Sequence, residues 1–105
     1  MEEILNNKAI RSQKPIAVNY SDETIRILVE EYLTQQQCAF SLKGVCNYVL
    51  YWAMEDGKAT HADNALYDGN TICHDDCDHI SQVLARIARE GRIAAYGEQF
   101  EILNN

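Results

Sequence analysis

The chain has 105 residues, 47% of them hydrophobic, and a formal net charge of −7 at pH 7. This length and composition predict a single globular domain and exclude a largely disordered chain. The negative charge excludes strong long-range attraction to a polyanion, although it leaves room for a local basic contact surface.

Neither a membrane span nor an export signal is expected. The most apolar stretch, residues 45–54, is about half as long as a helix that crosses a membrane. The chain begins Met-Glu-Glu, without a basic start that leads into an apolar run. We therefore expect a cytoplasmic protein, and in that compartment its four cysteines would be reduced thiols.

The beginning of the chain is its most basic part. Residues 1–14 lack a clear helical period and carry three basic side chains, Lys8, Arg11 and Lys14. We expect them to form a basic N-terminal arm, either mobile or folded as a short first helix, in front of a domain that spans residues 15–105. Pro15 would break any helix at this point, and the residues 16–20 that follow are extended in character.

A first helix is predicted after Ser21. This residue is a suitable N-cap, and the two acidic residues that follow it favour a helix N-terminus. Apolar residues then recur three and four positions apart from Ile25 to Leu33, which is the period of one buried helical face. The helix is expected to end near Gln37, and residues 38–40 form a short apolar link.

A second helix is predicted for residues 42–55, between the suitable N-cap Ser41 and the helix-ending residue Gly57. Apolar side chains cover almost its whole circumference, so it should lie in the centre of the core or bury a face against a partner. A three-helix core rarely buries every face of one helix, and aromatic residues are enriched at interfaces. Tyr48 and Tyr51 are therefore candidate partner-interface residues, and the partner could be a second copy in a homodimer.

A long loop and a third helix are expected next. Residues 58–75 are polar and irregular, which predicts a loop of unusual length. Beyond it, apolar residues repeat with a helical period from Ile80 onward, so a helix should begin at Asp76 or Asp78. Gly91 is expected to end this helix.

A β-hairpin is predicted at the end of the chain. Residues 92–96 and 99–103 are typical of two short strands. The pair Gly97-Glu98 between them suits the tight mirror-image turns of hairpins. The predicted fold is therefore mainly α-helical with a small C-terminal β-hairpin.

These last elements resemble those of a known family. Residues 83–93, with the sequence VLARIAREGRI, and residues 96–103, with the sequence YGEQFEIL, resemble the third helix, wing and returning strand of winged helix-turn-helix domains. The resemblance implies a three-helix winged-helix domain. The connection formed by residues 58–75 is a departure, because that family usually has a tight turn between its second and third helices.

The resemblance also implies a way to bind double-stranded DNA. In that family the third helix enters the major groove, and the wing lies near the backbone or the minor groove. The contacts would come from the arm, the third helix and the wing, through Lys8, Arg11, Lys14, Ser81, Gln82, Arg86, Arg89, Arg92 and Tyr96. Three acidic residues at the start of the third helix would repel phosphates, namely Asp75, Asp76 and Asp78.

Two functions follow from these observations. The first is a winged-helix regulatory protein that binds double-stranded DNA. The second is a winged-helix protein–protein interaction module whose acidic surface meets a basic partner, and such a surface could act as a nucleic-acid mimic or inhibitor. No enzyme is expected, because no cysteine–histidine pair has an orienting third group or an adjacent oxyanion turn.

The cysteines offer a weak metal-site candidate. Cys73, Cys77 and His79 carry the thiolate and imidazole groups that zinc prefers. Their spacing does not match the common zinc motifs, and no second cysteine pair follows, so we expect no cofactor. The other two cysteines, Cys38 and Cys46, lie among apolar residues and should pack as small hydrophobic side chains.

Overall fold

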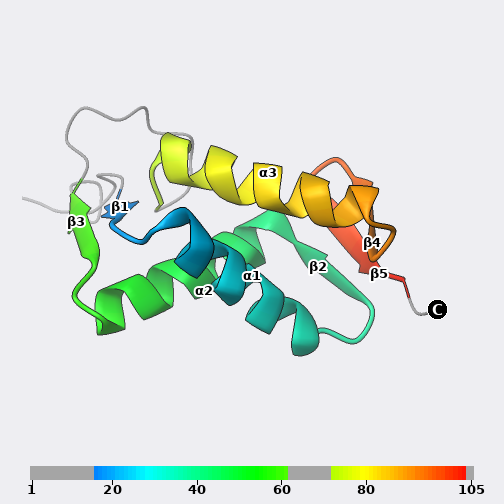
Figure 1. Cartoon of the computed structure of the whole chain (residues 1–105), viewed down its shortest axis with the longest axis horizontal. Coiled ribbons are helices and arrows are strands. Elements are labelled where there is room, and N and C mark those ends of the chain that lie inside the picture. Colours follow the sequence, from blue (N-terminus) through cyan, green and yellow to red (C-terminus); the bar gives the residue numbers. More distant parts are fainter. Residues whose placement is uncertain (1–15, 62–71, 104–105) are drawn as a thin grey trace, which may run out of the picture.

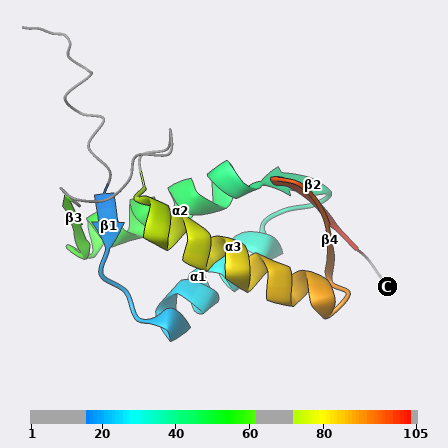
Figure 2. The same cartoon turned by 90° about the horizontal axis from the view of Figure 1, so that it is seen from above.

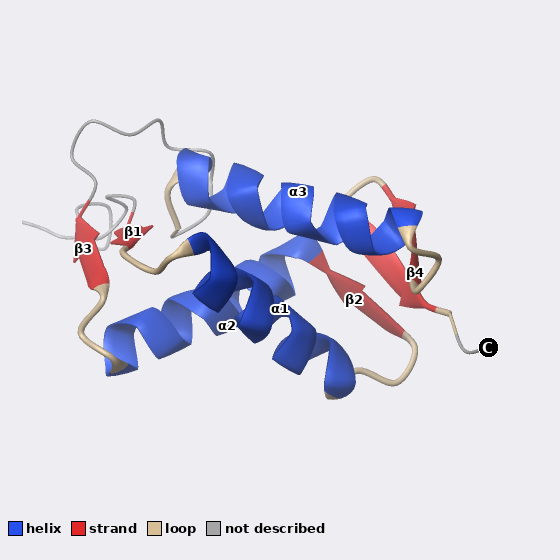
Figure 3. Cartoon of the chain, in the orientation of Figure 1, coloured by secondary structure: helices blue, strands red, loops and turns tan. Residues whose placement is uncertain are grey.

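The computed structural model describes residues 16–61 and 72–103 as a mixture of helices and strands (Figures 1 and 3). The helices are α1 (Asp22–Thr34), α2 (Leu42–Glu55) and α3 (His74–Arg89). The strands are β1 (Ile16–Val18), β2 (Ala39–Ser41), β3 (Ala59–His61), β4 (Ile93–Tyr96) and β5 (Gln99–Ile102). The predicted basic arm, residues 1–14, lies outside the described residues.

α1 and α2 begin where the capping residues predict. The side chain of Ser21 accepts a hydrogen bond from the backbone N–H of Thr24, and that of Ser41 accepts one from Gly44. The predicted bounds of α2 are confirmed. α1 ends three residues earlier than expected, at Thr34, because the chain must turn there to reach β2.

α3 begins at His74, earlier than either predicted start. Its N-cap residue is Cys73, whose backbone is extended and whose side chain makes no capping hydrogen bond. A sequence search for capping side chains therefore misses this start. The helix ends before Gly91, whose φ of 82° continues the chain in a left-handed conformation.

The predicted hairpin is confirmed and forms part of a larger sheet. β4 pairs with β5 in antiparallel register, and Gly97 in the turn has a φ of 69°, as a mirror-image turn requires. β5 also pairs with β2, which places Phe40 opposite Phe100 and gives the strand order β2-β5-β4. Residues 38–40 were expected to be only a link, so this strand corrects the prediction.

A second correction concerns the expected loop, residues 58–75. Its beginning is strand β3, which pairs antiparallel with β1. Its end is the first turn of α3, and residues 62–71 lie outside the described ranges. Two hydrogen bonds join β1 to this turn: Cys73 donates its N–H to the carbonyl of Ile16, and Val18 donates its N–H to Asp76, each over 2.9 Å.

All three helices contribute to one hydrophobic core. α3 packs against both α1 and α2, and the two small sheets lie at opposite ends of the helices (Figures 1 and 2). The most deeply buried large side chains are Ile25, Val29, Val45, Val49, Ile72, Ile80, Leu84 and Ile87. Burying a side chain of this kind contributes about 1.5–3 kcal/mol to folding.

The two cysteines expected in the core differ in their exposure to solvent. Cys46 is buried, as predicted, whereas Cys38 is exposed at the turn before β2. The prediction for Cys38 is wrong because its apolar neighbours belong to an edge strand of the sheet, where alternate side chains face solvent. Within the described ranges, no helix is both long and apolar enough to cross a membrane.

Candidate functional site

The solvent-facing side of α3 carries charges of both signs. Asp75 and Asp78 are exposed at its start, and Arg86 and Arg89 are exposed in its last turn. Within the described part of the chain, neither arginine has an ion-pair partner. The helix dipole favours this distribution, because it attracts acidic groups to the N-terminus and basic groups to the C-terminus. The charges therefore have a structural explanation that does not require a ligand.

The other predicted contact residues of α3 are less available. Gln82 donates a hydrogen bond to the carboxylate of Asp78 over 3.0 Å, and Ser81 is half-buried. Asp76, which was expected to repel phosphates, turns inward and accepts the hydrogen bond from Val18 described above. The face that a DNA-reading helix would present thus carries two exposed carboxylates at its start. Further along the same helix, the Gln82 side chain is engaged in a hydrogen bond to Asp78.

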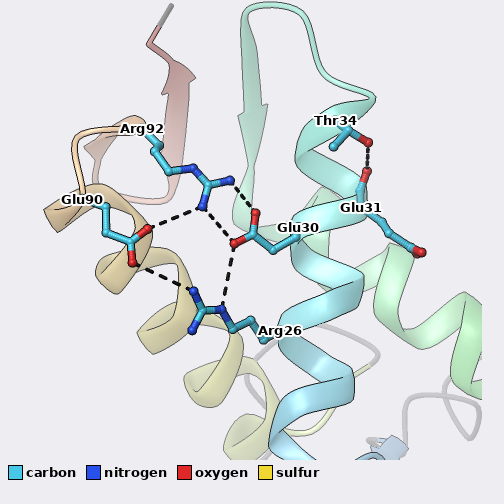
Figure 4. Close-up of polar contacts among 6 residues, drawn as sticks. All are labelled: Arg26, Glu30, Glu31, Thr34, Glu90 and Arg92. Carbon is cyan, nitrogen blue, oxygen red and sulfur yellow. Dashed lines mark hydrogen bonds and ion pairs between the residues drawn. The ribbon is translucent and has the colours of Figure 1, made fainter. Parts of the chain in front are cut away.

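Arg92, predicted to contact DNA beside the wing, is held by carboxylates instead (Figure 4). Its guanidinium donates to both oxygens of Glu30 on α1 and lies 3.5 Å from Glu90. Arg26 completes the group, at 3.9 Å from Glu30 and 4.0 Å from Glu90. Glu31 points away from this network and accepts, through its backbone carbonyl, a hydrogen bond from Thr34.

This network changes the proton affinities of its members. The hydrogen bond from Arg92 holds the pKa of Glu30 below its ordinary value, against the opposing effect of burial. The same pair raises the pKa of Arg92 further. Both groups are charged at neutral pH, so Glu30 neutralises the cation that the resemblance would assign to DNA.

The remaining predicted DNA contacts lie at the wing and in the arm. Tyr96 is 65% exposed, and its hydroxyl donates a hydrogen bond to Glu101 across the hairpin over 3.4 Å. It is therefore available for contact. The three basic residues of the arm, Lys8, Arg11 and Lys14, lie outside the described residues.

A groove of about 1010 Å³ is lined by residues of α1 and α3. Its floor is apolar, formed by Val83, which is buried, and Ile27, which is 50% exposed. Four carboxylates contributed by α1 line it, namely Asp22, Glu23, Glu30 and Glu31. Two arginines line it as well, Arg26 from α1 and Arg86 from α3. The groove thus combines an apolar centre with an excess of acidic groups.

Comparisons of the chain with protein-family models, curated proteins and solved structures found no match. Any function must therefore be argued from the residues of this chain.

The two tyrosines predicted to form a partner interface have different environments. Tyr48 is half-buried between the rings of Tyr32 and Trp52, and its hydroxyl lies 3.3 Å from Gln35. Tyr51 is 56% exposed and packs edge-on against Trp52. Tyr48 therefore belongs to the internal packing between α1 and α2, and Tyr51 is the residue that a partner could reach.

The structure does not bring the candidate metal ligands together. The thiol of Cys73 donates to Asp76 over 3.0 Å, and Cys77 lies in the core with its sulfur 3.8 Å from that of Cys46. His79 faces Asp22 in the α1–α3 groove, at 3.6 Å. No group of three or more ligand side chains suited to a metal ion occurs among the described residues.

The surroundings of Cys73 also change the proton affinity of its thiol. Burial, together with the hydrogen bond to Asp76, raises the pKa of its thiol to about 11. A thiol with this pKa is protonated at neutral pH, in keeping with its role as hydrogen-bond donor to Asp76.

Several residues of the groove were not predicted from the sequence, among them Ile27 and Glu30. Ile27 does carry a signal, because it lies outside the apolar stripe of α1 that Ile25 begins. A large aliphatic side chain on the polar face of a helix is a candidate contact point. Glu30 carries no such signal, because its partner Arg92 is distant in the sequence.

Proposed function

We propose that this chain has a winged-helix type of scaffold. The order of the elements supports the proposal: α1, β2, α2 and α3 precede the hairpin formed by β4 and β5. The pairing of β2 with the returning strand β5 also supports it, because it attaches the hairpin to the helical core. The strands β1 and β3 are additions, and β3 lies in the long connection between α2 and α3.

On this scaffold we propose a protein–protein interaction module that uses acidic surface to meet a basic partner. The observation that carries the proposal is the neutralisation of Arg92 by Glu30 and Glu90. It removes a cation from the base of the wing. The exposed carboxylates of Asp75 and Asp78 at the start of α3 add negative charge where a DNA reader would approach phosphates.

Binding to double-stranded DNA is the second candidate. It is favoured by Arg86 and Arg89, which are exposed on α3 and have no ion-pair partner within the described ranges. Arginine can bind guanine edges or phosphates, so this pair could form a local contact. Two arginines would neutralise few phosphates, and the resulting affinity would be weak and strongly dependent on salt.

A retardation experiment separates the two functions. We expect the full chain to leave a fluorescently labelled pool of DNA duplexes unshifted at low salt. A shift that weakens with added salt and disappears in the Arg86→Ala/Arg89→Ala variant would contradict the interaction module and support DNA binding.

Capture of a partner tests the interaction module directly. We expect the immobilised chain to retain a basic protein from an extract of its source cells, and the Arg86→Ala/Arg89→Ala variant to retain it equally well. Reversing exposed charges with Asp75→Lys/Asp78→Lys or Glu23→Lys/Glu31→Lys identifies the acidic surface that is used. If neither variant weakens capture, the partner does not recognise acidic surface on this domain.

A further inference from the structure

We propose that the groove between α1 and α3 is the docking site for a basic amphipathic helix of a partner protein. This inference rests on the proposed interaction module, and it names the site and the partner chemistry. The proposed helix would place one aliphatic side chain against Ile27 and Val83, and basic side chains on both sides of it.

The apolar floor supplies the anchor point. Ile27 is 50% exposed although it is a large aliphatic residue, and it lies in the groove beside the buried Val83. Covering it with an aliphatic side chain removes apolar surface from water, which favours association. Because the anchor is small, charge must contribute much of the specificity.

The acidic groups supply the complementary charge. Glu30 is engaged by Arg92 and Arg26 within the fold, so it has little attraction to offer a partner. Glu23 and Glu31 are exposed and face no arginine or lysine within the described ranges. The Glu31 carboxylate accepts a hydrogen bond from the hydroxyl of Tyr48 over 3.4 Å and keeps its negative charge. Glu23 and Glu31 lie on either side of Ile27 along α1, which places a carboxylate beyond each end of the apolar floor.

The spacing of these carboxylates fits a helix. Glu31 follows Glu23 by eight positions within α1, which corresponds to about 12 Å along the helix axis. A partner helix with basic residues seven or eight positions apart has the same spacing, and its aliphatic residue midway would face Ile27. An extended peptide would span this distance in about four residues, so it would need its basic residues about four positions apart.

Arg86 sets a further condition on the partner. It lines the groove on the α3 side, and within the described part of the chain its guanidinium makes no ion pair. A uniformly basic helix would be repelled at this point. The partner should therefore present an acidic or neutral side chain toward α3 and its basic side chains toward α1.

A designed peptide tests the site. The probe is a fluorescein-labelled peptide of about 16 residues, with leucines on one face, lysines flanking them at the stated spacing, and one glutamate on the α3 side. Its binding to the full chain is followed by fluorescence anisotropy. We expect saturable binding that weakens with salt, and no binding by a scrambled peptide of the same composition.

Two charge-reversal variants with the same net charge locate the contact. Glu23→Lys/Glu31→Lys should weaken probe binding about tenfold, whereas Glu55→Lys/Glu101→Lys, on α2 and β5, should change it less than about twofold. Ile27→Ser should weaken binding about fivefold. Circular dichroism spectra verify that each variant is folded.

Several outcomes would overturn the proposal. Equal weakening by the two charge-reversal variants would indicate nonspecific attraction, and absence of saturable binding would remove the site. The labelled probe is also challenged with an unlabelled peptide of residues 1–14. If this peptide displaces the probe at lower concentrations than the unlabelled form of the probe does, the groove is assigned to the chain's own basic terminus.

The test also distinguishes this inference from the function on which it rests. DNA binding through Arg86 and Arg89 would contradict the interaction module itself. Capture of a partner that is insensitive to Glu23→Lys/Glu31→Lys but lost in Asp75→Lys/Asp78→Lys would preserve the interaction module and reject the groove.

Discussion

Individual side chains decide how much positive charge this domain offers to a ligand. Arg92 is the clearest case, because its two hydrogen bonds to Glu30 join the segment between α3 and β4 to α1. Bidentate arginine–carboxylate pairs are stronger than pairs between single atoms. The exposed fractions of the two side chains, 46% and 29%, nevertheless allow solvent to screen the interaction.

The contribution of this pair to stability can be measured by a double-mutant cycle. We expect Arg92→Ala and Glu30→Ala to show a coupling free energy of about 0.5–1 kcal/mol in urea unfolding at neutral pH. The folded-state pKa of Glu30 is lowered, so its contribution is complete above the unfolded value near 4.5. It should be lost as the pH falls through the lower folded value.

A control variant separates this coupling from general loss of charge. Arg89→Ala removes an exposed arginine that has no ion-pair partner in the described ranges, and it should change the unfolding free energy by less than about 0.5 kcal/mol. If the coupling free energy persists unchanged well below the folded-state pKa of Glu30, the coupling between Arg92 and Glu30 does not arise from their ion pair.

At the scale of elements, aromatic rings connect the hairpin sheet to the helices. Phe100 on β5 stacks on Phe40 of β2 at 5.2 Å between centroids, and Phe40 meets Tyr32 of α1 edge-on at 5.8 Å. Tyr32 in turn lies 5.3 Å from Tyr48 of α2. These separations are within the favourable range for aromatic pairs, so β2 joins the sheet to the core.

The hairpin turn gives a prediction about one element. The φ of 69° at Gly97 is strained for other residues, and a Cβ added there would contact nothing within 4 Å. Gly97→Ala should therefore cost about 1 kcal/mol in unfolding free energy through backbone strain alone. Gly97→Asn should cost less, because asparagine tolerates this conformation better. Equal stability of Gly97→Ala and the unmodified chain would contradict the turn geometry.

At the scale of the whole molecule, one core extends through the three helices and reaches both sheets. Val18 of β1, Phe40 of β2 and Ile93 of β4 belong to the same buried cluster as the helix side chains. A domain with one continuous core is expected to unfold cooperatively. The two small sheets should therefore not melt separately from the helices.

The cooperativity can be tested with two probes. Trp52 is the only tryptophan, lies at the surface of α2 and contacts Tyr48 and Tyr51. Its fluorescence and the far-UV circular dichroism of all three helices should give the same urea midpoint. A fluorescence transition at lower urea would show that α2 loosens before the rest of the domain.

Local signals in the sequence determined much of the architecture. The apolar period of each helix, the caps at Ser21 and Ser41, and the turn at Gly97 were sufficient to predict three helices and a hairpin. These signals work because each depends on residues within a few positions of one another. The excess of acidic residues was also evident from composition alone.

The tertiary structure determined which of these elements contact one another. The pairing of β2 with β5, the pairing of β1 with β3 and the capture of Arg92 by Glu30 all join segments that are far apart in the sequence. Such contacts depend on how the helices pack, and no local pattern specifies them. For the same reason, the groove around Ile27 and the loss of Arg92 as a free cation became visible only in the folded chain.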